Sequence, residues 1–123
     1  MPSPGAATSR LLLSEVALGN MYECTDAQYV IGPSQSAKND ADSKHYSHLA
    51  LPASKHSTFG VGQTAPAKDA AETTDDGVMI PLGKGGPSGA SSSLLYNEYI
   101  VYDTAQIKMK YLIKTKFVFN TRW

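Results

Sequence analysis

Large apolar side chains alternate with lysines in IKMKYLIKTKFVF, residues 107–119. A period of two is typical of a β-strand with one apolar face and one wet face. Leu112 and Val118 interrupt the polar side, which predicts that part of the second face is also covered. We therefore expect one long strand in this part of the chain.

The sequence before this stretch predicts further strands. Residues 94–103 (LLYNEYIVYD) have the length and composition of a strand that is buried on both faces. Because residues 103–106 form only a short link, we expect this strand to pair antiparallel with the long one. Residues 11–19 (LLLSEVALG) predict another strand, whose partner cannot be named from the sequence. The turn signal Asp76-Gly77 precedes a short edge strand at residues 78–82.

Polar and glycine-rich stretches separate the expected strands. Residues 1–10 predict a disordered N-terminal segment, rich in Pro, Ser, Ala and Gly. Residues 24–54 are dominated by Ser, Asp, Lys, Asn and Ala, and they predict a long surface insertion. Residues 64–76 and 83–93 predict further loops.

The composition excludes several classes of protein. Eleven basic and eleven acidic residues leave no net charge over the 123 residues, so the chain as a whole carries no electrostatic footprint for nucleic acid or membrane. Cys24 is the only cysteine, which rules out a disulfide framework and fits a reducing compartment. We see no Cys/His zinc ligand set, no targeting segment and no membrane helix in the sequence.

Asn97 and Glu98 stand out in the middle of the apolar run 94–103. An ionised carboxylate is costly to bury there unless it is paired or hydrogen-bonded. The residues alone leave two interpretations open. Glu98 points to solvent from an edge strand, or it is a functional carboxylate held on a rigid element.

Other candidate residues carry less weight. Glu15 is a second carboxylate within an apolar strand, and we expect it to be structural or solvent-facing. His45 and His48 have a spacing that suits a metal on a helix, yet they lie in a polar loop without further ligands, so we predict no metal site. Residues 83–89 lack the pattern of a phosphate loop. A basic stripe could face a polymer or nucleic acid, although a solvated strand face is the simpler interpretation; it consists of Lys108, Lys110, Lys114 and Lys116.

Several blocks of the sequence occur together in one order. SLLYNEYIVYD at residues 93–103 resembles the most recognisable C-terminal motif of the DNA-damage-dependent poly(ADP-ribose) polymerases. The match covers nearly everything after Arg10 except the insertion at 24–54. The other blocks in the family's order are EVALGNMYE (15–23), Lys55-His56-Ser57 with Gly60, Gly62 and Pro66, DGV (76–78), PLG (81–83), KYLIK (110–114) and Trp123.

The resemblance implies a fold and an activity. Residues 11–123 would be the C-terminal part of the family's catalytic domain, a partial α+β ADP-ribosyltransferase fold that is mostly antiparallel β in this chain. The family transfers ADP-ribose from NAD, its co-substrate, to protein acceptors and extends the chain without a metal. Glu98 would be the glutamate of the family's His-Tyr-Glu triad. It would hydrogen-bond the 2′-hydroxyl of the nicotinamide ribose, polarise the acceptor hydroxyl and stabilise an oxocarbenium-like transition state.

The resemblance also assigns positions around Glu98. Tyr96 and Asn97 match residues that border the acceptor side of the site, while strand packing and a strand hydrogen bond are their alternative roles. A glutamate at position 98 is typical of family members that build chains. His56 does not match the triad histidine, which in the family lies in a His-Gly pair well upstream.

The family's upstream NAD-binding half, with the triad histidine and tyrosine, has no counterpart in this sequence. We therefore expect an incomplete catalytic domain whose partner is the missing N-terminal half. The alternative is a short product without catalysis, which acts as an interaction or dominant-negative module through strand edges. The resemblance implies a nuclear location, no membrane contact, and contact with DNA only through modules absent here.

A few positions depart from the family pattern. Phe59 and Gln63 stand where relatives often carry lysine, and Ser54 stands where glycine is usual. Arg122 replaces the leucine that commonly precedes the final tryptophan. In the family this tail helps to dock an accessory factor that redirects the enzymes toward serine acceptors, so Arg122 puts the binding of that factor in doubt.

Overall fold

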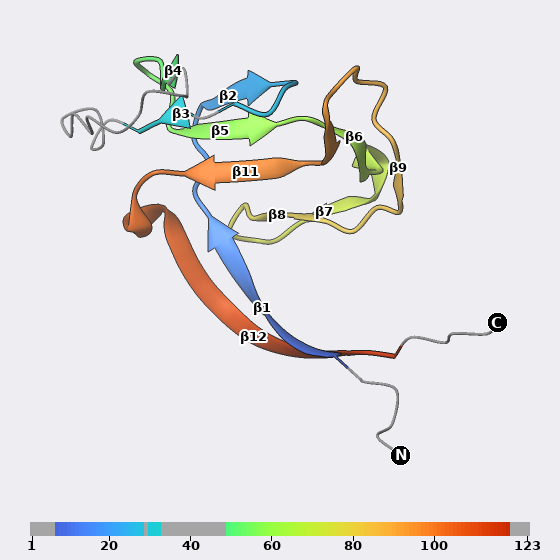
Figure 1. Cartoon of the computed structure of the whole chain (residues 1–123). Coiled ribbons are helices and arrows are strands. Elements are labelled where there is room, and N and C mark those ends of the chain that lie inside the picture. The colour runs from blue at the N-terminus through green and yellow to red at the C-terminus, as the bar shows by residue number, and fades with distance from the viewer. Residues whose placement is uncertain (1–6, 29, 33–48, 119–123) are drawn as a thin grey trace. The chain divides into compact units, whose positions relative to one another are not determined.

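The computed structural model describes residues 7–28, 30–32 and 49–118 of the chain (Figure 1). The chain divides into two compact units, Met1–Val16 with Ile107–Trp123, and Ala17–Gln106. Strands dominate the described part, most ladders are antiparallel, and its helical pieces are two short 3₁₀ turns, Lys68–Ala70 (η1) and Thr104–Gln106 (η2). The expected partial α+β fold, mostly antiparallel β in this chain, is confirmed. No helix in these described ranges has the length and apolarity to cross a membrane.

The first unit is a two-stranded antiparallel ribbon of β1 (Ala7–Val16) and β12 (Ile107–Phe117), drawn in blue and red in Figure 1. The alternation in β12 is matched across the ladder, where Leu11 lies opposite Ile113 and Leu13 opposite Tyr111. The register shifts between Leu13 and Ser14, which marks a β-bulge. The long strand predicted from its period is confirmed, and its partner is β1.

The ribbon differs from the prediction in two details. β1 begins at Ala7, so residues 7–10 do not belong to a disordered N-terminal segment. They form a ladder instead because β12 is long enough to supply partners for their backbone groups. Leu112 and Val118 are 66% and 75% exposed, so the second face of the strand is not covered as predicted. Phe119, Arg122 and Trp123 lie outside the described residues.

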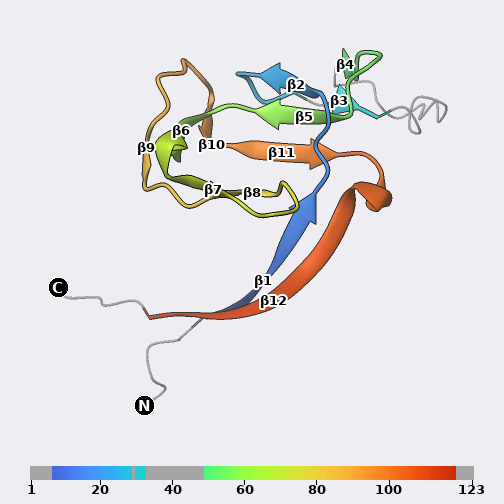
Figure 2. The ribbon, with the colours of Figure 1, turned by 180° about the vertical axis from the view of Figure 1, so that it is seen from behind.

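The second unit contains a sheet with β5 (Ser57–Gly60) in the middle. β11 (Glu98–Val101) pairs antiparallel with one edge of β5, and β2 (Met21–Cys24) pairs parallel with the other. The three strands lie side by side in both views (Figures 1 and 2). Since β5 is flanked on both edges, it is the central strand on which the candidate site is built.

Two of the residues that β5 buries have polar side chains. Ser57 is fully buried and donates its hydroxyl to the Leu18 carbonyl at 2.7 Å. Thr58 is 4% exposed, and its Oγ1 shares a 2.6 Å hydrogen bond with the hydroxyl of Tyr102. Because buried polar groups must be paired to avoid a desolvation penalty, these two bonds fix the segments on either side of β5.

Shorter strands surround this sheet. β6 (Gly62–Pro66) lies between β10 (Leu94–Tyr96), which is parallel to it, and β9 (Gly85–Pro87), which is antiparallel. The segments predicted as loops at 64–76 and 83–93 therefore carry short strands. The ends of the predicted insertion at 24–54 form a parallel pair, β3 (Val30–Ile31) and β4 (Leu49–Ala50), while His45 and His48 lie outside the described residues.

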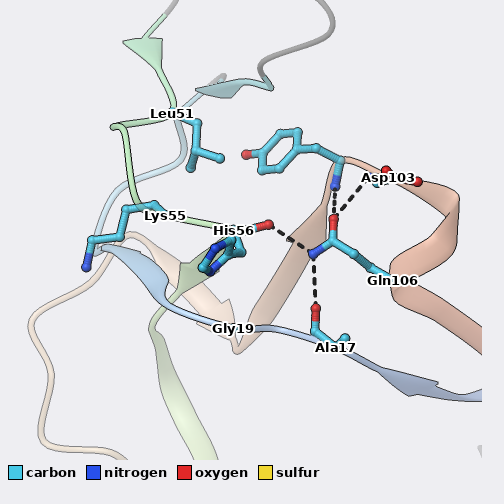
Figure 3. A pocket seen from close by; sticks show the side chains of 8 residues that line it. Ala17, Gly19, Leu51, Lys55, His56, Asp103 and Gln106 are labelled. Carbon is cyan, nitrogen blue, oxygen red and sulfur yellow. Dashed lines mark hydrogen bonds between the residues drawn. The ribbon is translucent and has the colours of Figure 1, made fainter.

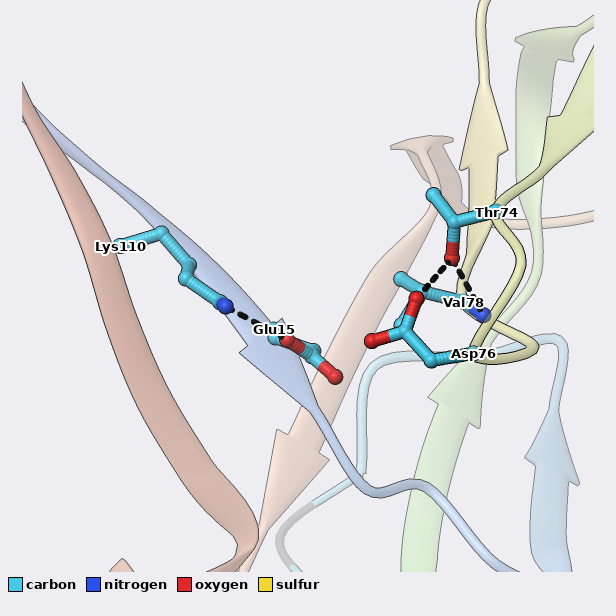
Figure 4. A network of polar contacts seen from close by, with 5 residues as sticks. All are labelled: Glu15, Thr74, Asp76, Val78 and Lys110. Carbon is cyan, nitrogen blue, oxygen red and sulfur yellow. Dashed lines mark hydrogen bonds and ion pairs between the residues drawn. The ribbon is translucent and has the colours of Figure 1, made fainter.

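The predicted turn at Asp76-Gly77 is confirmed between β7 (Ala71–Thr73) and β8 (Met79–Pro81). Gly77 adopts a φ of 85°, which glycine reaches without strain. The Thr74 hydroxyl donates to Asp76 Oδ1 at 2.7 Å and accepts the Val78 N–H at 3.0 Å (Figure 4). The side chains of the turn thus satisfy its backbone, as its residue types predict.

The prediction of one buried strand over residues 94–103 is wrong. The run is divided at Asn97 into β10 and β11, which join different sheets. Leu95 and Tyr96 are 66% and 67% exposed, so burial on both faces is not found. The expected pairing with β12 is also absent, because β11 pairs with β5 while β12 pairs with β1.

Candidate functional site

Glu98 occupies the first position of β11, in a row that crosses three strands. It lies opposite Gly60 of β5, and Gly60 lies opposite Cys24 of β2. A Cβ atom added at Gly60 would lie 2.6 Å from Leu94 Cδ1 and 3.5 Å from Glu98 Cβ. The absence of a Cβ at Gly60 therefore leaves room for the Leu94 side chain, with which a larger residue would clash.

A small cavity of about 100 Å³ lies beside the Glu98 side chain. Since a water molecule occupies about 30 Å³, the cavity admits a few waters or a hydroxyl group next to the carboxylate. Its volume is far too small for a whole dinucleotide. The lining residues are Cys24, Asp26, Ala27, Gln28, Thr58, Gly60, Leu94, Glu98 and Ile100.

Cys24 forms part of this wall and is a poor nucleophile there. Burial raises the pKa of the Cys24 thiol, and the nearby Asp26 carboxylate raises it further. The thiol Sγ lies 3.7 Å from Gln28 Oε1. Because the thiolate is the reactive form of cysteine, both effects keep Cys24 protonated and inert at neutral pH.

Asn97 creates the break between β10 and β11. Its side-chain Oδ1 accepts the backbone N–H of Gly62 at 2.9 Å, which ties the break to the start of β6. A Cβ atom at Gly62 would lie 2.3 Å from the Tyr96 carbonyl carbon, so only glycine allows this approach. The structure thus gives Asn97 the strand hydrogen bond that was its alternative role.

Tyr96 and Asn97 line a different cavity from Glu98. This larger cavity has a volume of about 660 Å³. On its wall the rings of Phe59 and Tyr99 stack with centroids 4.7 Å apart and an interplanar angle of 3°. Tyr99 follows Glu98 directly in β11, and successive strand residues point to opposite faces. Of the three residues predicted for the site, the structure therefore brings two to one cavity and places Glu98 on another.

A third cavity, of about 550 Å³, lies where the chain enters and leaves the central sheet (Figure 3). His56 Nδ1 accepts the backbone N–H of Asn20 at 2.9 Å, which places the proton of the neutral ring on Nε2. Lys55 Nζ donates to the Met21 carbonyl at 3.1 Å. These contacts give the Lys55-His56 pair a structural role in holding the segment before β2.

Gln106 joins three chain segments at this third cavity, and the sequence offers no signal for it. Its Oε1 accepts the backbone N–H groups of Tyr102 and Asp103 at 3.2 and 3.1 Å. Its Nε2 donates to the carbonyls of Ala17 and His56 at 3.0 Å each (Figure 3). The side chain thus links the segment before β2, the start of β5 and the end of β11.

No cluster of three or more His, Cys, Asp or Glu side chains that could hold a metal occurs within residues 7–28, 30–32 and 49–118. Glu15, the other carboxylate singled out in the sequence, forms an ion pair of 3.4 Å with Lys110 on the ribbon (Figure 4). This contact agrees with a structural role for Glu15. Of the two carboxylates singled out in the sequence, Glu98 is the one for which the structure gives an exposed position on a strand with a cavity beside it.

Residues 39–117 match the family model described as the poly(ADP-ribose) polymerase catalytic domain. The chain is 46% identical over 112 residues to poly [ADP-ribose] polymerase 1 of Gallus gallus, which covers 90% of this chain and 9% of that protein. It is 48% identical over 115 residues to poly [ADP-ribose] polymerase 1 of Xenopus laevis, with 93% and 10% covered.

A plant protein shows the same similarity. Poly [ADP-ribose] polymerase 2 of Arabidopsis thaliana is 46% identical over 114 residues, which covers 92% of this chain and 15% of that protein. The chain therefore spans roughly a tenth of the length of the curated relatives it matches.

Proposed function

Because the chain belongs to the family of the poly(ADP-ribose) polymerase catalytic domain, we propose that it forms part of an NAD-dependent poly-ADP-ribosyltransferase in which Glu98 is the catalytic carboxylate. The observation that carries the proposal is the position of Glu98. The carboxylate is exposed at the start of β11, opposite Gly60, and it lines a small cavity.

The chemistry of ADP-ribosyl transfer suits a single carboxylate. The bond between the nicotinamide ring and the ribose breaks, and a bond forms between that ribose carbon and an acceptor hydroxyl oxygen. Nicotinamide leaves as a neutral group from a cationic ring, so no general acid is needed. A carboxylate stabilises the positive charge that develops on the ribose and accepts the proton of the attacking hydroxyl.

The cavity beside Glu98 fits one part of this reaction. With about 100 Å³ it takes a sugar or acceptor hydroxyl, and Thr58 and Gln28 offer polar groups on its wall. NAD as a whole needs a larger site. We infer that the remainder of the NAD site lies in sequence outside these 123 residues, since the relatives are about ten times longer than the chain.

A nuclear location, protein acceptors and polymer extension belong to the same proposal. Their support is the resemblance to the family, which includes the glutamate at position 98. Tyr96 and Asn97 are proposed to act on the acceptor side only indirectly, through the shape of the break that precedes Glu98.

A second candidate function has its own support. Many large apolar residues of the ribbon are exposed, among them Leu11, Leu12, Tyr111 and Leu112. An exposed apolar two-stranded ribbon is a surface that seeks a partner. The chain could therefore act as a non-catalytic interaction module through its strand edges, and an active protein containing it would count against this alternative.

The proposal is tested in a chimera, since the chain spans only part of its relatives. The matching 112 residues of the Gallus gallus protein are replaced by this chain, and incorporation of labelled ADP-ribose from NAD is measured. Glu98→Gln keeps the shape of the side chain and removes the charge, and we expect polymer formation to fall by at least about 100-fold.

Glu15→Gln is the matched control, because it is the same substitution at a carboxylate paired with Lys110. We expect it to leave incorporation within about twofold. Full polymer formation by the Glu98→Gln chimera would show that Glu98 is not the catalytic carboxylate. For the 123-residue chain alone, calorimetry should detect no micromolar binding of NAD. Micromolar binding would contradict the inference that the rest of the NAD site lies outside these 123 residues.

A further inference from the structure

The charges of this chain are separated between its two units. Met1–Val16 with Ile107–Trp123 contains six basic residues and one acidic residue, whereas Ala17–Gln106 contains five basic and ten acidic residues. The net charge of zero is therefore the sum of +5 on the first unit and −5 on the second. A charge asymmetry of this size between parts of a chain points to a charged partner for one of them.

The basic residues of the ribbon lie together in its register. Arg10 of β1 is directly opposite Lys114 of β12, so their side chains share a face. Lys116 is two residues further along β12 and projects from the same face. All three are exposed. We call this surface, formed by Arg10, Lys114 and Lys116, the basic face.

Like charges directly opposite each other destabilise a two-stranded ladder. The acidic residue of the ribbon, Glu15, does not offset them, because it pairs with Lys110 at the other end of β1 (Figure 4). An anion seated between Arg10 and Lys114 would turn their repulsion into two favourable charge-assisted contacts. The register therefore favours an anionic ligand on this face.

We propose that the basic face binds the phosphates of the ADP-ribose polymer itself. Opposite Cβ atoms in a ladder are about 5 Å apart, which suits two cations on one pyrophosphate. Lys114 and Lys116 are separated by about 6.8 Å along the strand, so Lys116 reaches an adjoining charge of the same chain. A linear polymer with paired phosphates matches this arrangement.

The expected strength of the contact decides between this polymer and a freely diffusing nucleic acid. Three cations release few counterions. A plot of the logarithm of the association constant for a single-stranded polyanion against the logarithm of the salt concentration therefore has a slope of only about −2. Such a face binds a free polyanion weakly at physiological salt. A polymer that grows on the same protein is present at a high effective concentration, so weak contacts suffice to hold it. This step rests on the proposed function, because a polymer must be made by the protein that contains the chain.

The proposal is tested by fluorescence anisotropy with end-labelled poly(ADP-ribose) and the 123-residue chain, between about 50 and 200 mM salt. For Lys114→Gln/Lys116→Gln we expect affinity to fall about tenfold at the lowest salt and the salt slope to shrink by about 1.4. Lys114→Arg/Lys116→Arg keeps both charges and should bind like the unchanged chain.

Lys68→Gln/Lys84→Gln is the matched control, since it removes the same charge from exposed positions of the acidic unit. An equal loss in this control, or no binding by the unchanged chain at the lowest salt, would overturn the proposal. Tighter binding to a single-stranded oligonucleotide with the same number of phosphates would show that the face is a nucleic-acid site instead. The assay needs no catalysis, so its outcome is independent of the role of Glu98.

Discussion

The Gln106 side chain offers the sharpest test of how the central sheet is held. Gln106→Met keeps the length of the side chain and removes its hydrogen bonds. The lost partners are the N–H groups of Tyr102 and Asp103, at 3.2 and 3.1 Å, and the carbonyls of Ala17 and His56, at 3.0 Å each. Each of the three segments that meet at the sheet would lose a contact.

The structure sets the size of the expected effect. A neutral hydrogen bond contributes a net of about 1 kcal/mol, so four bonds give an upper value of about 4 kcal/mol. Gln106 is half-buried, and water can reach part of the exposed backbone after the substitution. We therefore expect the free energy of unfolding to fall by about 2 kcal/mol, a large share of the stability of a small domain.

Urea unfolding followed by circular dichroism measures this loss. Gln63→Met is the matched control, because Gln63 makes a single side-chain hydrogen bond, from Nε2 to the Ser92 carbonyl at 2.8 Å. We expect the control to lose about 0.5 kcal/mol. Gln106→Glu keeps the acceptor toward Tyr102 and Asp103 but sets a negative charge against two carbonyls, so it should not rescue the loss. Equal stabilities of the two methionine variants would refute the role given to Gln106.

Two further predictions concern single residues. Ser54 has a φ of 71°, the left-handed conformation that glycine adopts without strain, so Ser54→Gly should raise the free energy of unfolding by about 0.5–1 kcal/mol in the same urea assay. The same substitution at Ser91 should give no gain, and a gain there of equal size would contradict the explanation. Burial raises the pKa of Tyr99, and a hydrogen bond with Asn97 offsets part of this shift. Because the unfolded chain then loses the phenolic proton at a lower pH than the folded chain, the free energy of unfolding should fall as the pH rises above about 10. In Tyr99→Phe the free energy of unfolding should fall less steeply with pH, whereas the control Tyr111→Phe, on the exposed ribbon, should leave the slope unchanged. An unchanged slope in Tyr99→Phe would contradict this explanation.

The sequence predicted the elements that depend on local pattern. The alternation of lysines and apolar residues located β12, and Asp76-Gly77 located a turn that its own side chains complete. These features follow from the period of a strand and from the chemistry of a few neighbouring residues. They need no knowledge of distant parts of the chain.

The partners of the strands could not be predicted in the same way. An apolar run such as residues 94–103 indicates a strand, but the run does not state which strand it pairs with or where it breaks. The break at Asn97 depends on a hydrogen bond to Gly62, and the link by Gln106 depends on carbonyls of Ala17 and His56. Such contacts join residues far apart in sequence, and no local period encodes them.

The position of Glu98 follows from two glycines in the pair of strands beside it. Gly62 lets the Tyr96–Asn97 peptide lie against the start of β6, which divides the apolar run and makes Glu98 the first residue of a new strand. Gly60 lies two residues earlier, opposite Glu98, and its missing Cβ leaves room for the Leu94 side chain on the wall of the cavity beside the carboxylate. Val61, between them, donates its N–H to the Cys24 carbonyl at 2.8 Å and so joins the same turn of chain to β2. One bend between β5 and β6 therefore both creates the break before Glu98 and contributes Gly60 to the wall of the cavity beside it, so a carboxylate in an apolar run becomes the exposed first residue of a new strand.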